Sequence, residues 1–346
     1  MKRRTLLASG LALAAPGIAR AQASTLRFVP VADVTVLDPF FAGPDVTIQH
    51  ANMVYDALYG LDRDSQPHPQ MAAGASVEND GRLWRIRLRE GLRFHDNEPV
   101  LARDAVASLN RWMSVDVFAA KLRSVLAELR AADDRTIEFR LTRPFPLLPY
   151  ALAKPATYPA YILPERLVAG GERGRMPEVI GSGPFRYRAD ERVVGSRVVY
   201  EKFAGYVPRA EPGNYMSGGK RVHFDRVEWQ IIPDASTAIA SLQKGEVDWV
   251  GDIAPDHAPA LRRDPRLVVQ IQDFIGGEAI LRNGKVLGVT TSADYGHTVG
   301  APIVYGYVAA EEAEHDTYEV EVYGEVYGAK RAAKPLYDPE GLKINA

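Results

Sequence analysis

Residues Gly276–Gly288, GGEAILRNGKVLG, divide this 346-residue sequence into two parts of different character. Strand-like and helix-like patterns alternate before this stretch, and only short strand-like patterns follow it. Alternation is typical of an α/β layer fold, whereas a run of short strands is typical of a small antiparallel structure. The sequence therefore predicts an α/β domain over residues 24–277 and a small antiparallel β-barrel over residues 278–346.

The first 23 residues are predicted to be a secretory signal peptide. Three basic residues precede the apolar run Leu6–Ile18, which is too short to span a bilayer, and Ala21–Ala23 has the small-x-small pattern of a cleavage site. Arg3–Leu7 also fits a twin-arginine pattern, so two export routes remain open. We expect cleavage near Ala23 and a periplasmic mature chain.

The charge balance, the lack of cysteine and the lack of catalytic motifs exclude several classes of function. Removal of residues 1–23 takes away four basic residues and changes the formal net charge from −2 to −6, so we expect no nucleic-acid partner. The sequence has no cysteine, and therefore no disulfide, thiolate metal site or lipid-anchoring cysteine. No catalytic elbow, paired-histidine metal motif or cofactor loop occurs, so we expect no catalytic residue, no metal and no cofactor.

The clearest strand pattern is Leu83–Leu88, in which apolar residues alternate with arginines. One face of this strand is predicted to be buried and the other to be basic, with Arg85, Arg87 and Arg89 in one row. Two interpretations remain: an anion site, or a solvated face whose arginines pair with nearby carboxylates. The second is favoured because charge rows are usually solvated and paired.

A second group of patterns predicts a parallel crossover. Leu26–Val29 is a first strand, Val222–Pro233 is another, Ser236–Lys244 is a short helix that stops at a glycine, and Val247–Val250 returns to strand. A strand, helix, strand succession of this kind is typical of an α/β layer structure.

Two polar, turn-rich segments are candidate ligand-binding loops. They are Ala32–Thr35 and Gly43–Thr47, and both follow extended stretches near the start of the mature chain. Loops at strand ends commonly carry ligand contacts, although plain solvent loops have the same composition. The candidate ligand-binding residues are Asp33, Thr35, Asp45 and Thr47.

Two further motifs are interpreted as structural turns. His95 lies in the tight turn Phe94–Pro99 without a second histidine or carboxylate at a metal-like spacing, so we expect a hydrogen-bonded structural residue. Ile180–Tyr187 is rich in glycine but has neither the dinucleotide spacing nor a Gly-Lys-Ser/Thr ending. We expect it to be a sharp turn into a strand.

Six motifs lie in order along residues 26–282: Leu37-Asp38-Pro39, Tyr55-Asp56-Ala57-Leu58, Asp80–Trp84, Leu88–Asp96, Gly181–Phe185 and Leu242–Asp248. Together they resemble the extracellular solute-binding proteins of the peptide, nickel and opine type that serve ABC importers. The resemblance implies a periplasmic-binding-protein-like lobe with a mixed sheet, a peptide or small-solute ligand, and an ABC permease partner in the inner membrane. It also implies a monomer.

The resemblance ends near Arg282, where the family continues into a second lobe that closes on the ligand. We therefore expect an incomplete clamp whose binding is impaired. Two residues depart from the family pattern. Asn97 replaces a glycine at modest backbone cost, and Leu101 replaces a helix-capping threonine at a cost of about 1 kcal/mol.

The tail carries a second resemblance. Its motifs are Gly284–Gly288, Thr290–Gly300, Gly306-Tyr307-Val308 and Pro335–Gly341, and Tyr318, Val320 and Val322 alternate with glutamates. They resemble the C-terminal barrel of the glycine-cleavage T-protein and of dimethylglycine dehydrogenase. In that aminomethyltransferase-type family the folate chemistry belongs mainly to upstream domains, so the resemblance implies that this barrel alone is not an enzyme.

Three functional hypotheses follow from these patterns. The first is a periplasmic substrate-binding component of an ABC importer. The second is a folate-dependent one-carbon component whose other domains come from another chain, which conflicts with an export signal. The third is a recombined chain, joined near Ile280–Arg282, without a selected function.

Overall fold

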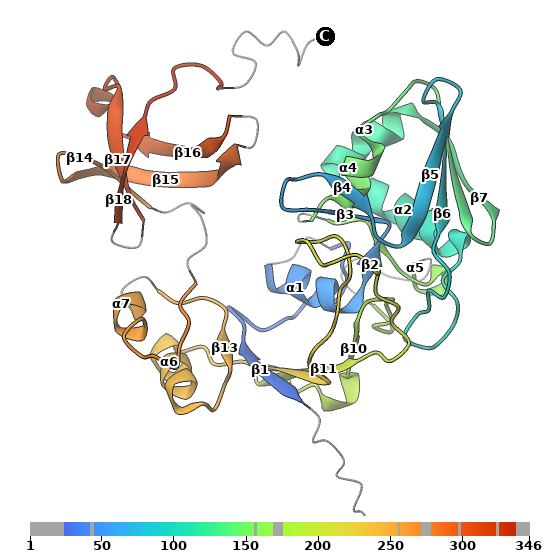
Figure 1. Ribbon diagram of the computed structural model, residues 1–346, viewed down its shortest axis with the longest axis horizontal. Helices are drawn as coiled ribbons and strands as arrows, with labels where there is room; N and C mark the ends of the chain where they lie inside the picture. Colours follow the sequence, from blue (N-terminus) through green and yellow to red (C-terminus); the bar gives the residue numbers. More distant parts are fainter. Residues whose placement is uncertain are drawn as a thin grey trace, which may run out of the picture.

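The computed structural model describes residues 24–41, 45–155, 158–168, 176–254, 257–270, 278–296, 299–322 and 325–336 (Figure 1). The predicted signal peptide, residues 1–23, lies outside the described residues. Across the described residues no helix combines the length and the apolar character that crossing a bilayer requires. The described chain forms three sheets of four or five strands, the third of them near the C-terminus, and two small two-stranded sheets.

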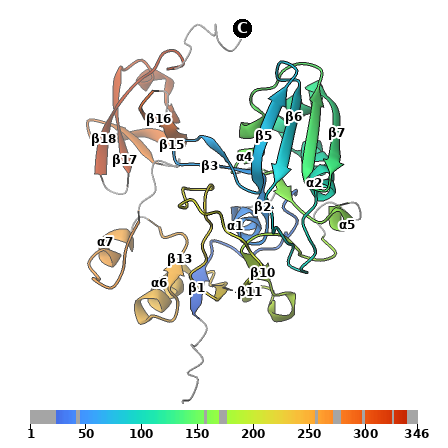
Figure 2. The same ribbon diagram turned by 45° about the vertical axis from the view of Figure 1, so that its right-hand side comes forward.

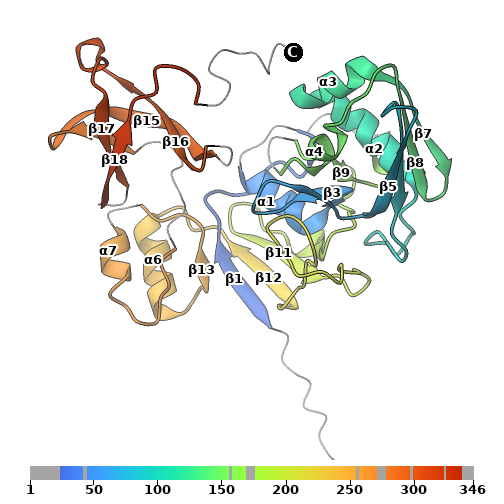
Figure 3. The same cartoon turned by 45° about the horizontal axis from the view of Figure 1, so that its top comes forward.

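The first sheet is mixed and has the strand order β10-β11-β12-β1-β13 (Figure 3). Its strands are β1 (Thr25–Val29), β10 (Phe185–Tyr187), β11 (Arg197–Lys202), β12 (Arg226–Gln230) and β13 (Trp249–Val250). β1 pairs in parallel with both β12 and β13, whereas β10, β11 and β12 pair antiparallel. The predicted parallel crossover is confirmed, and β1 lies between its two strands.

Helix α6 (Ala235–Lys244) connects β12 to β13 and has a clear signal at each end. The Asp234 carboxylate accepts a hydrogen bond from the Thr237 N–H at 2.7 Å, which caps the first turn. Gly245 ends the helix with a φ of 74°, a left-handed conformation that glycine adopts without strain. The terminal glycine confirms the predicted end of this helix, and the Asp234 cap begins it one residue before the predicted start.

The second sheet is antiparallel, with the order β5-β6-β8-β7, and its strands lie side by side in Figure 2. They are β5 (Ala72–Glu78), β6 (Leu83–Leu88), β7 (Leu126–Asp133) and β8 (Thr136–Leu141), and helices α2 (Ala102–Val115) and α3 (Val117–Val125) lie beside them. Leu101 makes no side-chain cap for α2; instead its N–H donates to the Asp104 carboxylate at 2.8 Å.

On the outer face of this second sheet, Arg85 is paired with carboxylates, as the favoured interpretation of the arginine row predicts. Glu138 on β8 is buried, and its carboxylate accepts hydrogen bonds from Arg85 at 2.9 Å, Arg130 at 2.7 Å and Arg140 at 2.8 Å. Arg89 lies beyond the end of β6 and donates to a backbone carbonyl at 2.8 Å instead. The face is a charge-paired surface rather than an anion site.

Further elements lie between the strands of these two sheets or follow β13. They are α1 (Asp45–Val54), β2 (Asp56–Ala57), β3 (Tyr59–Leu61), β4 (Pro67–Pro69), α4 (Leu148–Ala153), β9 (Tyr161–Ile162), α5 (Glu165–Val168), η1 (Ala189–Glu191) and α7 (Ala258–Leu261). One hydrophobic core runs through both sheets and includes Tyr55, Trp112, Phe139 and Trp229. The two sheets therefore belong to a single packed lobe.

The tail forms a five-stranded antiparallel sheet with the order β16-β15-β14-β17-β18. Its elements are β14 (Ala279–Arg282), β15 (Lys285–Gly296), β16 (Ala301–Val308), η3 (Ala310–Glu312), β17 (Thr317–Val322) and β18 (Glu325–Lys330). Ile280, Leu281, Val320 and Val322 are its buried apolar residues. The antiparallel tail is confirmed; among the described residues β16 and β18 do not pair with each other, so the sheet is an open half-barrel.

Candidate functional site

The carboxyl ends of β1, β12 and β13 lie at one edge of the first sheet because the three strands run parallel. The segments that follow them are residues 30–35, 231–234 and 251–254, which we call the sheet rim. Open α/β sheets bind ligands in the crevice outside the carboxyl ends of their strands. The sheet rim is therefore the candidate ligand-binding site.

A hairpin turn at residues 193–196 lies against the sheet rim. The Gly195 N–H donates to the Asp33 carboxylate at 2.8 Å, and the Ile231 N–H donates to the Ser196 carbonyl, also at 2.8 Å. Gly195 has a φ of 71°, a left-handed conformation that glycine adopts without strain, and makes this turn. Val194 at the tip is 81% exposed, so the rim presents apolar as well as polar surface.

Asp33 holds the rim in shape through an ion pair. Its carboxylate oxygens lie 2.6 and 2.8 Å from Nη2 of Arg192, and the same nitrogen donates to the Val34 carbonyl at 3.2 Å. The Asp33 and Arg192 side chains are only 14% and 11% exposed. Since the carboxylate already accepts hydrogen bonds from Arg192 and from the hairpin, the geometry suits a positioning role for Asp33.

The other three candidate residues are Thr35, which is two residues from Asp33, and Asp45 and Thr47 in helix α1. Thr35 is exposed, and Asp45 is exposed in the first turn of α1. Thr47 is buried, and its hydroxyl donates to the Val36 carbonyl at 3.2 Å, which ties α1 to the residue after Thr35. Thr35 and Asp45 can therefore reach a ligand directly, whereas Asp33 and Thr47 hold the loop; their contact with a ligand stays a prediction.

An aromatic cluster lies beneath the rim around His50 of α1. The His50 ring is buried, its Nδ1 lies 2.9 Å from the Tyr200 hydroxyl, and the rings of Tyr187 and Tyr55 lie 5.6 and 6.3 Å from it. Burial, with a smaller contribution from Arg192, lowers the pKa of His50 to about 3. The His50 imidazole is therefore neutral near neutral pH.

The Leu37-Asp38-Pro39 motif anchors the segment that leads from the rim into α1. Asp38 is fully buried, and its carboxylate accepts a hydrogen bond from the Phe40 N–H at 3.0 Å and an ion pair from Arg111 of α2. The Arg111 guanidinium also lies over the Phe40 ring, 5.3 Å from its centre. Arg111 could not be predicted as the partner of Asp38, because nothing local in the sequence pairs the two residues.

The predicted structural role of His95 is confirmed. Its N–H donates to the Gly181 carbonyl at 2.9 Å, Nδ1 accepts from the Gly181 N–H at 3.3 Å, and Nε2 donates to the Gly183 carbonyl at 3.0 Å. Burial lowers the pKa of His95 to about 4. The Gly183 N–H donates in turn to the Val54 carbonyl at 2.8 Å, so two of the six motifs meet at the end of α1.

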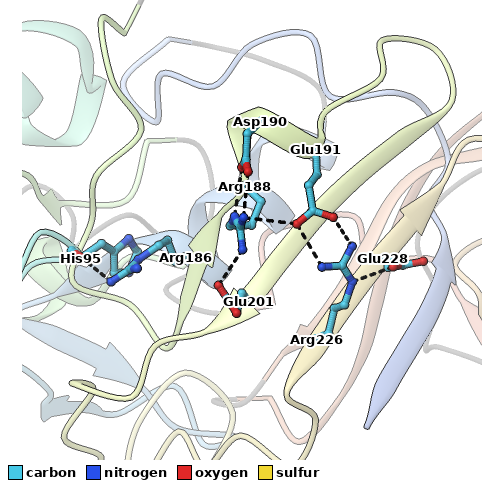
Figure 4. A network of polar contacts seen from close by, with 8 residues as sticks. All are labelled: His95, Arg186, Arg188, Asp190, Glu191, Glu201, Arg226 and Glu228. Atoms are coloured by element: carbon cyan, nitrogen blue, oxygen red, sulfur yellow. Dashed lines mark hydrogen bonds and ion pairs between the residues drawn. The ribbon is translucent and has the colours of Figure 1, made fainter. Parts of the chain in front are cut away.

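Charged residues on the first sheet are paired with one another (Figure 4). Arg188 lies 3.0 Å from Glu201 and 2.8 Å from Asp190, and Arg226 lies 2.6 Å from Glu228 and 2.5 Å from Glu191. Arg186 of β10 makes a separate contact, because it donates to the His95 carbonyl. The network braces β10, β11 and β12 rather than presenting an isolated charge to a ligand.

The part of the chain that the structure describes holds no group of three or more histidine, aspartate or glutamate residues that could bind a metal ion. The rim combines exposed hydroxyl, carboxylate and apolar groups. Such a mixture suits reversible binding of a small polar solute.

Lowering the pH from about 7 to about 5 is expected to reduce the free energy of unfolding through His50 and His95. Their folded pKa values, about 3 and about 4, lie below the ordinary 6.5, so the unfolded chain binds protons that the folded chain does not. Their contribution is fully present above pH 6.5 and is lost as the pH falls from there towards the folded values. Each histidine adds a slope of up to about 1.4 kcal/mol per pH unit in that window.

Urea titrations across this pH range measure the slope. His95→Gln is expected to make it shallower, and His223→Gln serves as the control because His223 is exposed. Equal slopes for the two variants would contradict this origin of the acid sensitivity.

Comparisons with known proteins support both resemblances. A family model described as the glycine cleavage T-protein C-terminal barrel domain matches residues 266–338, which include the whole described tail sheet. This match covers a minor part of the chain and overlaps the match reported below from residue 266 to residue 287.

Two curated relatives match most of the chain. The probable peptide ABC transporter periplasmic-binding protein y4tO of Sinorhizobium fredii is 35% identical over 283 residues, which cover 80% of this chain and 52% of that protein. The glutathione-binding protein GsiB of Salmonella typhi is 29% identical over 288 residues, which cover 82% of this chain and 52% of that protein. The chain thus spans about half the length of the curated relatives it matches.

A solved structure shows the same fold. The oligopeptide-binding protein AppA of Bacillus subtilis, in complex with a nonapeptide, superposes with a TM-score of 0.59 at 19% identity, covering 75% of this chain and 50% of that one. The family model for bacterial extracellular solute-binding proteins, family 5, matches residues 66–287, more than half of the chain. The expected resemblance is confirmed, and the chain belongs to the bacterial extracellular solute-binding proteins of family 5.

Proposed function

We propose that this protein is the periplasmic substrate-binding component of an ABC importer for peptides or similar small solutes. The observation that carries the proposal is the family match over residues 66–287, on a lobe whose three parallel strands end at the sheet rim. The proposed partners are a small solute or peptide and an ABC permease of the inner membrane. Residues 1–23 act as the export signal and are removed near Ala23, and the protein is not an enzyme.

The ligand contacts Thr35 of the sheet rim and Asp45 in the first turn of α1, while Asp33 and Thr47 fix the segments that carry them. The Thr35 hydroxyl and the Asp45 carboxylate are exposed to solvent. The hydrogen bond from the buried Thr47 to the Val36 carbonyl ties the segment that carries Thr35 to helix α1, which carries Asp45. The first lobe, residues 24–277, is the binding unit, and residues 278–346 form the attached tail domain.

Ligand binding is expected to raise the stability of the full chain. A ligand present at about 100 times its dissociation constant adds about 2.7 kcal/mol to the free energy of unfolding. Thermal shift assays with di- and oligopeptides and with small cationic ligands measure this effect. Removal of one hydroxyl in Thr35→Val is expected to weaken binding roughly threefold to tenfold, since a hydrogen bond contributes about 1 kcal/mol.

Thr317→Val is the matched control, because Thr317 is also exposed and lies in the tail sheet. It should bind as the parent chain does. No shift with any ligand would contradict the proposed binding function, and an equal loss in both variants would contradict a contact at the rim.

The match of residues 266–338 favours a second candidate function, a folate-binding role for the tail. Equilibrium dialysis of the full chain against tetrahydrofolate tests it. Retention of folate would support the second candidate, whereas free passage would leave the tail without a one-carbon role.

A further inference from the structure

Strand β16 forms one edge of the tail sheet and has a composition unusual for an edge. Among the described residues it pairs only with β15, so every second residue directs its backbone N–H and C=O away from the sheet. The strand reads APIVYGYV and carries no charged side chain. Such a strand is a ready partner for another strand.

Two tyrosines extend from this edge into solvent. Tyr305 is 68% exposed and Tyr307 is 78% exposed, and the two lie on the same face because side chains alternate along a strand. Val289, which is 50% exposed, lies opposite Tyr307 on β15 and enlarges the patch. An exposed aromatic and aliphatic surface of this kind is typical of an interaction site.

The other long edge strands of the described sheets carry charges. Glu78 lies on β5, Glu128, Arg130 and Asp133 lie on β7, and Glu325 and Lys330 lie on β18. Charged residues on an edge discourage strand pairing. Among the described edge strands of six or more residues, β16 alone carries no charged side chain. Its proline, Pro302, which lacks an N–H, is the second residue of the strand and precedes the segment Ile303–Tyr307.

Charge also indicates which partner fits. Residues 278–336 contain five basic and nine acidic residues, a net charge of −4, so two tails repel each other over most of their surface. The uncharged β16 edge is where two copies can approach without placing like charges opposite each other. The strand is also self-complementary, because an antiparallel pairing centred on Tyr305 places Ile303 of one copy opposite Tyr307 of the other.

We propose that β16 pairs antiparallel with β16 of a second copy, so that a two-fold axis joins two tails into a continuous sheet. Tyr305 then faces its own counterpart, and two Ile303–Tyr307 pairs flank it. Aromatic and β-branched residues are favourable cross-strand neighbours, and a two-fold interface closes at two subunits. The proposal replaces the sequence-based expectation of a monomer and does not depend on the proposed ligand.

Sedimentation and light scattering of the purified full chain, from low to high micromolar concentration, test the proposal. A concentration-dependent dimer is expected. Tyr305→Lys places two ammonium groups opposite each other and should weaken dimerisation by at least about tenfold. Tyr307→Lys is a second variant for the case in which the first does not fold, and Val326→Lys is the control on the exposed opposite edge, β18.

A covalent trap locates the contact. The sequence has no cysteine, so Tyr305→Cys creates a single thiol. Residues directly opposite across an antiparallel pair have the separation that a disulfide requires. Oxidation should trap Tyr305→Cys, but not Val326→Cys, as a dimer.

Three results would overturn the proposal. A monomer at every concentration would restore the earlier expectation. Oligomers that keep growing with concentration would exclude a closed pair. Equal loss of the dimer in the Val326→Lys control would show that β16 is not the contact.

Discussion

Replacing Gly181 with alanine is expected to destabilise the lobe by about 3 kcal/mol or more, because the added methyl group has no space. A Cβ at this position would lie 2.0 Å from the Val54 carbonyl oxygen and 2.7 Å from the Tyr55 ring. The first neighbour is backbone at the end of α1, so no side-chain rotation relieves the overlap. Any displacement of Val54 also strains the hydrogen bond that its carbonyl accepts from Gly183.

Urea unfolding followed by circular dichroism measures the effect. Gly74→Ala is the matched control, because a Cβ there meets nothing within 4 Å. That change should be neutral or stabilise the chain by about 0.4–1 kcal/mol through the unfolded state. Similar free energies of unfolding for the two variants would contradict the close approach of residues 181–183 to α1.

Local patterns predicted a large part of the fold. Alternation placed β6 and β17, and a terminal glycine placed the end of α6. These features depend on residues within one element, so they are readable without knowledge of the rest of the chain.

Long-range partners could not be predicted in the same way. Asp33 and Arg192 lie 159 residues apart, and Asp38 and Arg111 lie 73 residues apart. Their pairing depends on how the two sheets pack, which no single segment specifies. The glycines at 181 and 183 were correctly placed in a turn, but their real constraint is the approach of α1.

The tail shows the same limit. Its strands were predicted from alternation and turn residues, and its antiparallel sheet is confirmed. Whether such a sheet closes depends on the pairing of its first and last edges, β16 and β18, which the strand patterns do not encode. The open edge in turn supplies the basis for the proposed dimer.

Replacing Asp38 with asparagine is expected to cost about 3–5 kcal/mol, because it leaves the largely buried Arg111 charge without its partner. Asp38 is fully buried, and the Arg111 side chain is 13% exposed. Breaking one side of a buried pair costs more than the pair itself contributes, since the remaining charge stays desolvated. Ligand affinity should fall as well, because Asp38 anchors the segment that carries Asp33 and Thr35.

A double-mutant cycle with Arg111→Met separates the pair from its surroundings. Once the arginine is gone, Asp38→Asn should cost less, with a coupling free energy of about 1–3 kcal/mol. Asp80→Asn is the control, since its ion pair with Arg82 is exposed and should contribute no more than about 1 kcal/mol.

Arg111 lies on α2, beside the second sheet, and Asp38 lies in the segment that follows the rim of the first sheet. Strong coupling would therefore mean that this ion pair joins the two halves of the lobe. Equal costs for Asp38→Asn and Asp80→Asn would instead assign that role to the apolar core.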